Sequence, residues 1–365
     1  MVKIINLLQW QPGYSGFGSY IQRVLPHIDG LRVQVNSEGL IDLLEPSAWS
    51  TSPPPIAKNL FLRVLQRTSF LQYGVNLENI LKSYHHKIKD IDVIYSPFLD
   101  PIVQLRNTPQ VITCPDFIPF ISKESKRSYY RTKIFYPFYF SLATKLITYS
   151  QHVADQLVEK QVANQKITIV PCGIDVYRQR LNSPKSDDVI IIARHDKHKN
   201  LKFLLLALKR FKYQNSSWRG KINIVGKRGR MTQELKKLVN TFPYPNDINF
   251  IESIDSLSLI QLLRNSFVLI SASCEEGFDY PILEAKAEGV PTLISDIGVH
   301  REFHSESSLF FSLLDGTDSF CDVFKHLLVD DSIWSDLSLK GYALAKSMTI
   351  DNQVSQISSL INEIS

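Results

Sequence analysis

Short apolar runs alternate along most of this chain with amphipathic stretches of helical length, and this alternation restricts the fold more than any other feature. Runs of this length are typical of buried strands, and a chain that alternates such strands with helices forms parallel βαβ units. Strands are expected at 2–8, 33–36, 93–96, 111–114, 146–149, 167–170, 189–193, 221–225, 248–250, 268–271 and 292–295. Helices are expected at 18–27, 60–72, 77–87, 126–141, 151–159, 201–212 and 232–240, and again within 330–365. The pattern predicts an α/β protein with parallel sheets.

The length of the chain indicates two domains. With 365 residues it exceeds one ordinary core, and two domains of about 170 residues each are expected. Pro171-Cys-Gly-Ile-Asp175 is expected to end the first domain, and the polar residues 178–187 to form a linker. The three prolines at 53–55 mark a loop of the N-terminal domain. We therefore place an N-terminal domain at 1–175 and a second domain at 183–340.

Composition excludes several classes of protein. No stretch reaches the roughly 18 apolar residues that a membrane-spanning helix needs, and the N-terminus shows no basic region followed by a cleavage site. The cysteines form no C-x-x-C pair, which favours buried thiols over a disulfide framework or a zinc site. They are Cys114, Cys172, Cys274 and Cys321. These features together predict a cytoplasmic protein.

Basic residues are more informative in one local cluster than in the net charge of the whole chain. The net charge of +5 is mild and does not by itself imply a nucleic-acid partner, and no nucleic-acid-binding module accompanies it. Basic and aromatic residues are interleaved near residues 123–145, namely Lys123, Lys126, Arg127, Arg131, Lys133 and Lys145 with Tyr129, Tyr130, Phe135, Tyr136, Phe138, Tyr139 and Phe140. Two interpretations stay open: a peripheral membrane contact, or one helix that buries its rings and solvates its charges.

Two glutamates, Glu276 and Glu284, enclose seven residues in the second half of the chain. The pattern around them predicts a strand, an acidic loop, a short helix with Pro281 in its first turn and Gly289 after its end, and another strand. A helix N-terminus that follows a parallel strand presents free backbone N–H groups and a positive dipole end to an anionic ligand. Carboxylates beside these donors could bind hydroxyl groups, so the segment suits a phosphorylated sugar.

The segment Glu276-Gly-Phe-Asp-Tyr-Pro-Ile-Leu-Glu284 resembles the Glu-x7-Glu motif of retaining GT-B glycosyltransferases of the family-four, group 1 type. Flanking residues Ala285, Ala287, Gly289 and Pro291 fit the same pattern. The alternative is a solvated acidic loop before a surface helix. The resemblance implies two Rossmann-like, doubly wound parallel-sheet domains that face each other across a cleft. It also implies an acceptor-binding N-terminal domain, a nucleotide-sugar-binding second domain, and a final helix at 341–365 that packs back on the first.

A second segment supports the resemblance. Residues 167–175 are similar to the start of the family's interdomain linker, with Cys172 where relatives usually have Asn, and 189–200 resemble a strand and loop that carry a donor-binding Arg and Lys. Arg194 and Lys199 would stabilise the charge that develops on the leaving diphosphate, in the crevice at the carboxyl ends of a parallel sheet. A solvated basic loop is the alternative. Gly226 follows the next strand, where it would permit close approach of the nucleotide or form a plain turn.

The N-terminal glycines imitate a dinucleotide-binding fingerprint. Gly16 and Gly18 follow an expected strand, but Ile21 stands where the third glycine would be, so an NAD-dependent dehydrogenase is a weak alternative. The resemblance instead implies that Gly16, Phe17 and Gly18 form a loop facing the acceptor and the donor phosphate.

One position departs from the family. Many relatives carry His-Asp in the segment that matches 111–116, whereas this chain has Pro115 before Asp116. Asp116 remains a candidate catalytic residue that could contact a sugar hydroxyl or order the site. Because of Pro115, one alternative stays open: the chain is a non-catalytic homologue that acts as a partner of an active transferase.

The resemblance implies a retaining hexosyltransferase that takes GDP-mannose or a UDP-hexose as donor. Arg194 and Lys199 would bind the diphosphate, and Glu276 with the backbone of Gly277, Phe278 and Asp279 would position the sugar, while Glu284 would bind the ribose. The acceptor would be a hydroxyl of a glycan or lipid-linked glycan in cell-surface polysaccharide synthesis, at the inner face of the membrane. We expect no metal and no other cofactor. A GT-B sugar epimerase, which would release the nucleotide without an acceptor, is a further alternative.

Overall fold

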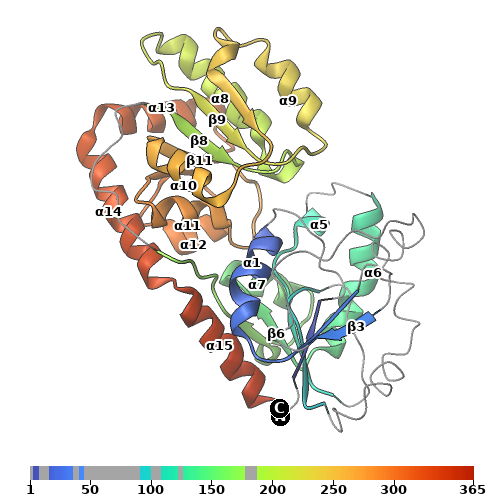
Figure 1. Cartoon of the computed structure of the whole chain (residues 1–365). Coiled ribbons are helices and arrows are strands. Elements are labelled where there is room, and N and C mark those ends of the chain that lie inside the picture. Colours follow the sequence, from blue (N-terminus) through green and yellow to red (C-terminus); the bar gives the residue numbers. More distant parts are fainter. Residues whose placement is uncertain are drawn as a thin grey trace. The chain divides into compact units, whose positions relative to one another are not determined.

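The computed structural model describes residues 3–7, 16–35, 41–44, 91–99, 108–121, 126–176 and 187–365, and it divides into two compact units (Figure 1). One unit takes its described residues from Met1–Phe117, Tyr130–Pro171 and Ile350–Ser365, and the other comprises Ile118–Tyr129 and Cys172–Thr349. The expected proline loop at 53–55, the helices at 60–72 and 77–87, and nearly all of the linker at 178–187 lie outside the described residues.

The first unit contains a seven-stranded sheet in its described part, in the order β3-β2-β1-β4-β5-β6-β7. The strands are β1 Lys3–Asn6, β2 Leu31–Val35, β3 Ile41–Leu44, β4 Val93–Ser96, β5 Gln110–Thr113, β6 Lys145–Thr148 and β7 Ile167–Ile169. All neighbours are parallel except β3, which pairs antiparallel with β2 at the edge of the sheet. The sequence pattern predicts every strand of this sheet except β3.

Helices of the first unit surround this sheet in the described part of the chain. They are α1 Gly16–Val24, α6 Lys126–Leu142, α7 Gln151–Glu159 and α15 Ile350–Glu363, with short 3-10 turns η1 Leu25–His27 and η3 Asn164–Lys166. The short helix α5 Ile118–Ile121 and the first residues of α6 group with the second unit. The Ser150 hydroxyl accepts the Val153 N–H at 3.2 Å and caps α7.

The C-terminal helix α15 belongs to the first unit although it follows the second in sequence. It packs against α1 (Figure 1), and Lys3 Nζ donates to Asn362 Oδ1 at 2.7 Å. Residues 341–347, which we expected to be part of the returning helix, instead complete α14 of the second unit. Ile174 donates its N–H to the Met348 carbonyl at 2.8 Å, which explains why residues 172–176 group with the second unit.

Helix α6 has two different faces. Tyr136, Tyr139 and Phe140 are buried, and Tyr136 and Phe140 pack against Phe117. Three apolar side chains spaced four residues apart lie on the surface: Tyr130, Ile134 and Phe138 are 59%, 65% and 48% exposed. The helix therefore buries part of the aromatic cluster and leaves three apolar side chains exposed.

The second unit is a six-stranded, fully parallel sheet in the order β10-β9-β8-β11-β12-β13. The strands are β8 Val189–Ile192, β9 Ile222–Val225, β10 Ile248–Ile251, β11 Val268–Ser271, β12 Thr292–Ser295 and β13 Leu309–Phe311. The helices are α8 Leu201–Gln214, α9 Thr232–Val239, α10 Ser256–Asn265, α11 Tyr280–Ala287, α12 Gly298–His304, α13 Gly316–Val329 and α14 Asp331–Ser347, with 3-10 turns η4 Lys197–Lys199 and η5 Pro245–Asp247. The short strand β13 was not predicted.

Alternate residues along each strand of this sheet contribute to two separate cores. Val189 and Ile191 of β8 join a core with residues of α8, α9, α13 and α14, whereas Ile190 joins a second core with α10 and α11. A parallel strand buried on both faces reads as a continuous apolar run, as Val189-Ile-Ile-Ile192 does. Both units are Rossmann-like α/β folds with parallel strands, as the sequence predicted.

The strand order places a topological switch between β8 and β11. The chain runs from β8 outward through β9 to β10, and then returns to β11 on the other side of β8. Ligands of open α/β sheets bind in the crevice outside the carboxyl ends of the strands at such a point. A ligand site is therefore expected at the loops after β8 and β11.

Candidate active site

The acidic loop has the local structure that the sequence predicted. Strand β11 ends at Ser271, the loop continues to Asp279, and α11 begins at Tyr280 with Pro281 in its first turn. Asp279 has a left-handed backbone conformation, with φ 69° and ψ 70°. For a residue other than glycine this conformation costs about 1–2 kcal/mol, so contacts of its side chain must hold it in place.

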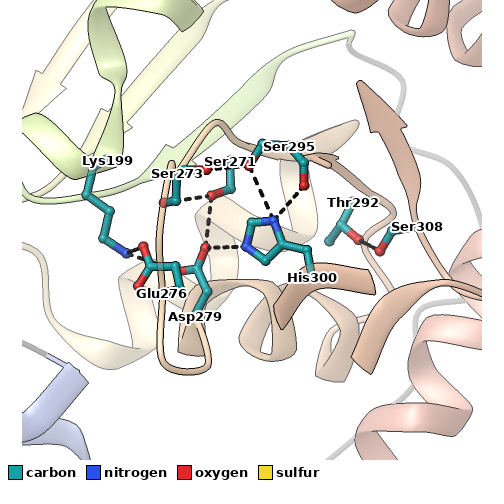
Figure 2. A network of polar contacts seen from close by, with 9 residues as sticks. All are labelled: Lys199, Ser271, Ser273, Glu276, Asp279, Thr292, Ser295, His300 and Ser308. Atoms are coloured by element: carbon teal, nitrogen blue, oxygen red, sulfur yellow. Dashed lines mark hydrogen bonds and ion pairs between the residues drawn. The ribbon is translucent and has the colours of Figure 1, made fainter. Parts of the chain in front are cut away.

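Lys199 meets this loop from the neighbouring strand β8. It ends the 3-10 turn η4, and Asn200 follows in a left-handed conformation. The backbone N–H of Cys274 donates to the His198 carbonyl at 2.8 Å and joins the two loops. Lys199 Nζ then lies 2.5 Å from Glu276 Oε1 and 3.1 Å from Asp279 Oδ1 (Figure 2). One ammonium is thus shared by two buried carboxylates.

The second oxygen of Asp279 is held by two further side chains. Ser271 Oγ donates to Asp279 Oδ2 at 2.9 Å, and His300 Nε2 lies 3.3 Å from the same oxygen (Figure 2). On the other side of the ring, His300 Nδ1 lies 2.8 Å from the Ser295 carbonyl. His300, Ser271 and Ser295 were not predicted as site residues. A signal was present, because Ser271 and Ser295 end adjacent parallel strands, β11 and β12.

Burial and neighbouring charges shift the pKa values of this cluster in opposite directions. Burial alone would lower the pKa of Lys199, but the carboxylates of Asp279 and Glu276 outweigh it and raise the pKa above its ordinary value. Burial alone would raise the pKa of Asp279, and Lys199, His300 and the Ser271 hydroxyl together hold it below its usual range. Both groups are therefore charged at neutral pH.

Arg194 and the glycines of the next loop form a neighbouring region. Arg194 follows the end of β8, its side chain is 59% exposed, and its Nε lies 3.1 Å from Asp196 Oδ2. A Cβ at Gly226 would lie 2.0 Å from the Ala193 carbonyl oxygen, and one at Gly229 would lie 2.3 Å from the His195 carbonyl oxygen. Both glycines are thus required where two backbone segments pack together. Arg194 does not join the cluster around Lys199.

The remaining predicted residues fall into two groups. Glu284 lies partly exposed on α11, and Gly277 and Phe278 are buried in the acidic loop. The Phe278 ring packs against Tyr280 and Phe303, with centroid separations of 5.6 and 4.9 Å, so its side chain contributes to packing. Asp116, after β5, and Gly16, Phe17 and Gly18, at the start of α1, belong to the first unit.

The described residues also bear on the cysteines, on metal ions and on membrane spans. All four cysteines are free thiols, but Cys274 is exposed, which corrects the expectation that all are buried. In the described ranges, His, Cys, Asp and Glu side chains form no group of three or more that could hold a metal ion. Among the helices that the structure describes, none has the length and apolar content needed to cross a bilayer.

Two glycosyltransferase families match consecutive parts of the sequence. The family described as Glycosyl transferases group 1 matches residues 174–308, which include the whole cluster around Lys199. Glycosyltransferase Family 4 matches residues 44–178. The two matches together run from residue 44 to residue 308.

The curated relatives that match the chain include two mannosyltransferases. The O-antigen chain mannosyltransferase RfbU of Salmonella typhimurium is 24% identical over 213 residues, which are 56% of this chain and 57% of RfbU. The serotype-specific mannosyltransferase WbdA of Escherichia coli is 36% identical over 90 residues, 24% of this chain and 11% of WbdA. The chain therefore spans little more than half of the first relative and a small part of the second.

The structural likeness extends over the whole chain. HepE of Anabaena, solved in complex with UDP-glucose, superposes with a TM-score of 0.72 at 14% identity and covers 100% of both chains. Sucrose-phosphate synthase of Thermosynechococcus elongatus gives a TM-score of 0.72 at 15% identity, over 100% of this chain and 99% of that one. At these identities the likeness establishes the fold.

Proposed function

This chain belongs to the glycosyltransferases of the GT-B fold, and from this premise we propose that it transfers a hexose from a nucleotide-diphospho-sugar to an acceptor hydroxyl with retention of anomeric configuration. The observation that carries the proposal is the cluster of Lys199, Glu276 and Asp279. It lies where β8 and β11 end, at the topological switch and at the N-terminus of α11. Cations and a helix N-terminus at such a place suit a diphosphate.

In this proposal each part of the site has a separate task. Arg194, whose guanidinium is largely exposed, and Lys199 bind the diphosphate and stabilise the charge that develops on it. Glu276 and the backbone of residues 277–279 position the hexose, and Glu284 on α11 binds the ribose. Because Lys199 is already paired with two carboxylates, donor binding must draw the ammonium partly away from Glu276. That carboxylate then becomes available to the sugar.

The transfer breaks the bond between the sugar C1 and the donor phosphate oxygen and forms a bond from C1 to the acceptor oxygen. The proton of the acceptor hydroxyl passes to the departing phosphate, which needs no protein base. We propose that protein cations and the α11 dipole stabilise the leaving group without an essential metal ion. In the first unit, we assign Asp116 to the acceptor side, together with Gly16, Phe17 and Gly18, which form the first turn of α1 and not the expected loop.

The relatives suggest the class of donor and acceptor. RfbU is named an O-antigen chain mannosyltransferase and WbdA a serotype-specific mannosyltransferase. These names support a GDP-mannose donor and a polysaccharide or lipid-linked glycan acceptor. HepE was solved with UDP-glucose, so a UDP-hexose is the second donor to test. Synthesis of a cell-surface polysaccharide at the cytoplasmic side of a membrane is the corresponding cellular role.

Nucleotide binding gives the first test. We expect GDP or UDP, with EDTA present, to raise the unfolding temperature, because a ligand at 100 times its dissociation constant adds about 2.7 kcal/mol to the stability of the folded state. The measurement is thermal unfolding with GDP, UDP, ADP, dTDP and NAD, followed by a turnover assay with the matching donor sugar.

The controls separate the alternatives. Stabilisation by GDP or UDP only when Mg²⁺ replaces EDTA would contradict metal independence. Stabilisation by NAD alone would favour the dehydrogenase. Nucleotide binding without transfer to any glycan acceptor would favour the non-catalytic homologue that Pro115 suggests, whereas release of the nucleotide without an acceptor would indicate an epimerase.

A second test concerns the membrane. We propose that the exposed face of α6 contacts anionic lipid through Tyr130, Ile134 and Phe138, with Lys126 and Lys133 also exposed on this helix. Apolar side chains with basic neighbours are typical of helices that lie at a bilayer surface.

Replacing both Ile134 and Phe138 by serine should lower binding to phosphatidylglycerol-containing vesicles in a flotation assay by at least about tenfold. Leu257→Ser, at an exposed site on α10, is the control. Equal binding of all three proteins, or no binding by the unmodified chain, would contradict the proposal.

A further inference from the structure

His300 is fully buried on α12, and both of its ring nitrogens face oxygen atoms. Nε2 lies 3.3 Å from Asp279 Oδ2, and Nδ1 lies 2.8 Å from the Ser295 carbonyl oxygen and 3.3 Å from Ser295 Oγ (Figure 2). A neutral imidazole carries only one N–H, so its other nitrogen must accept a hydrogen bond. The partners of His300 therefore determine how many protons its ring carries.

The partners of Nδ1 are both acceptors. A carbonyl oxygen can only accept, so the contact with Ser295 O requires a proton on Nδ1. The Ser295 hydroxyl donates its own proton to the Ser273 carbonyl at 2.6 Å, so it too can only accept from Nδ1. In a neutral ring this would leave Nε2 without a proton.

The partner of Nε2 is also an acceptor. Asp279 Oδ2 belongs to a carboxylate that receives the Lys199 ammonium at Oδ1 and the Ser271 hydroxyl at Oδ2. Two lone pairs, one on Nε2 and one on Oδ2, would face each other at 3.3 Å if the ring were neutral. The ionised state of Asp279 follows from the same partners, which hold its pKa below the usual range although burial opposes them.

We propose that His300 is an imidazolium in the folded protein, and that it positions the donor site by completing a charge-balanced cluster. Lys199 and His300 supply two positive charges, and Glu276 and Asp279 supply two negative ones. Loss of the His300 proton would leave this cluster with a net charge of −1 where a diphosphate must bind. It would also remove one of the contacts that hold Asp279 in its left-handed conformation. The role in donor binding rests on the proposed function, whereas the protonation state does not.

The other titratable groups near His300 do not take its place in balancing the charges of Glu276 and Asp279. His304, one turn further on α12, has its ring centroid 6.4 Å from that of His300. Burial first, and then the charges of Lys286 and His300, hold the pKa of His304 well below its ordinary value. Burial also lowers the pKa of Lys286, whose Nζ donates to Ser307 Oγ at 2.5 Å. Asp296 is exposed and forms a two-bond pair with Arg301, so Asp279 is the carboxylate that His300 contacts.

The protonation state is tested without any substrate. In long-range ¹H–¹⁵N spectra of protein labelled at histidine, we expect both ring nitrogens of His300 to be protonated at neutral pH, with the signal assigned by its loss in His300→Gln. A ring with one protonated and one unprotonated nitrogen at neutral pH would overturn the proposal. This result is independent of whether the protein transfers sugar.

The positioning role is tested by nucleotide binding and kinetics as a function of pH. His300→Gln should raise the dissociation constant of GDP or UDP, and the KM for the matching donor, roughly 10- to 100-fold, with a smaller change in kcat. In the unmodified protein, donor affinity should fall over the pH range in which NMR shows His300 losing its proton. His300→Gln should lack that dependence. The control His304→Gln, on the same helix and equally buried, should keep it.

The outcomes are distinguishable. A His300→Gln variant that is folded, and binds nucleotide with unchanged affinity and unchanged pH dependence, would refute the positioning role. Failure of the unmodified protein to bind any nucleotide would refute the proposed function, and the NMR result would then decide the charge assignment alone.

Discussion

Replacing Glu276 by glutamine is expected to lower kcat by roughly 10²–10³-fold, the usual effect of removing one group that stabilises a transition state electrostatically. The substitution keeps the shape of a side chain that is almost fully buried, and Lys199 keeps its contact with Asp279 at 3.1 Å. The loop should therefore persist while the carboxylate charge next to the sugar is lost. Steady-state kinetics with the donor that the nucleotide panel selects, together with the nucleotide dissociation constant, give the measurement. That constant should stay nearly unchanged, as it should in Glu276→Ala, which is expected to abolish turnover.

Neighbouring substitutions make the Glu276 test specific. Glu275→Gln removes an equal charge from the adjacent residue, which has no role in the proposed site, and should retain nearly full turnover. Arg194→Ala and Glu284→Ala should instead weaken nucleotide binding, because the proposal places them on the diphosphate and the ribose. Full activity of the Glu276→Gln variant would show that the acidic loop has been given the wrong role.

Most of the fold could be predicted because the central strands of both sheets are parallel and buried. Each central strand reads as a short apolar run, such as Val189-Ile-Ile-Ile192, and both faces of β8 contribute to a core. The strands that escaped prediction lie at edges. β3 pairs antiparallel at one edge of the first sheet, and β13, with three residues, lies at an edge of the second. Edge strands bury less apolar surface, so their sequences carry a weaker pattern.

Several residues of the candidate site were predicted, but the contacts between their side chains were not. Glu276 and Lys199 were identified from two separate segments. Both were placed at the carboxyl edge of one sheet, because ligands of parallel sheets bind where the strands end. Their direct ion pair was not foreseen, because it depends on how η4 and the acidic loop fold after β8 and β11. Asp279 was assigned a role only through its backbone, yet its side chain is the centre of the cluster. His300 carries no local motif, and it meets Asp279 only because β11 and β12 are neighbours.

The second large effect is expected for Lys199→Met, which should lower the free energy of unfolding by about 3–5 kcal/mol, the typical cost of removing one partner from a buried ion pair. The side chains of Lys199, Glu276 and Asp279 are only 16%, 7% and 1% exposed, so water can replace little of the lost interaction. Chemical denaturation at neutral pH measures the change. Lys202→Met is the matched control: Lys202 pairs with Glu234 at 2.6 Å, but these side chains are 53% and 48% exposed. Exposed pairs of this kind contribute less than about 1 kcal/mol.

The pH dependence separates loss of charge from loss of packing. In the unmodified protein the pKa of Lys199 is raised above its ordinary 10.5, so its contribution to stability is complete below that value and is lost only at higher pH. The pKa of Asp279 is lowered from 3.8, so its contribution is complete above that value and is lost only as the pH falls below it. Their contribution should thus be constant between about pH 5 and pH 9.

Lys199→Met should behave differently, because burial raises the pKa of Asp279 and the variant lacks the Lys199 cation that opposes this effect. The folded variant then binds a proton at a pH where the unfolded chain does not, and stability rises as the pH falls through that range. The difference in unfolding free energy between the two proteins should therefore shrink from neutral pH toward about pH 5. A difference that stays constant over this range would mean that methionine disturbs the packing around residue 199, and that the ammonium contributes little to the stability of the acidic loop.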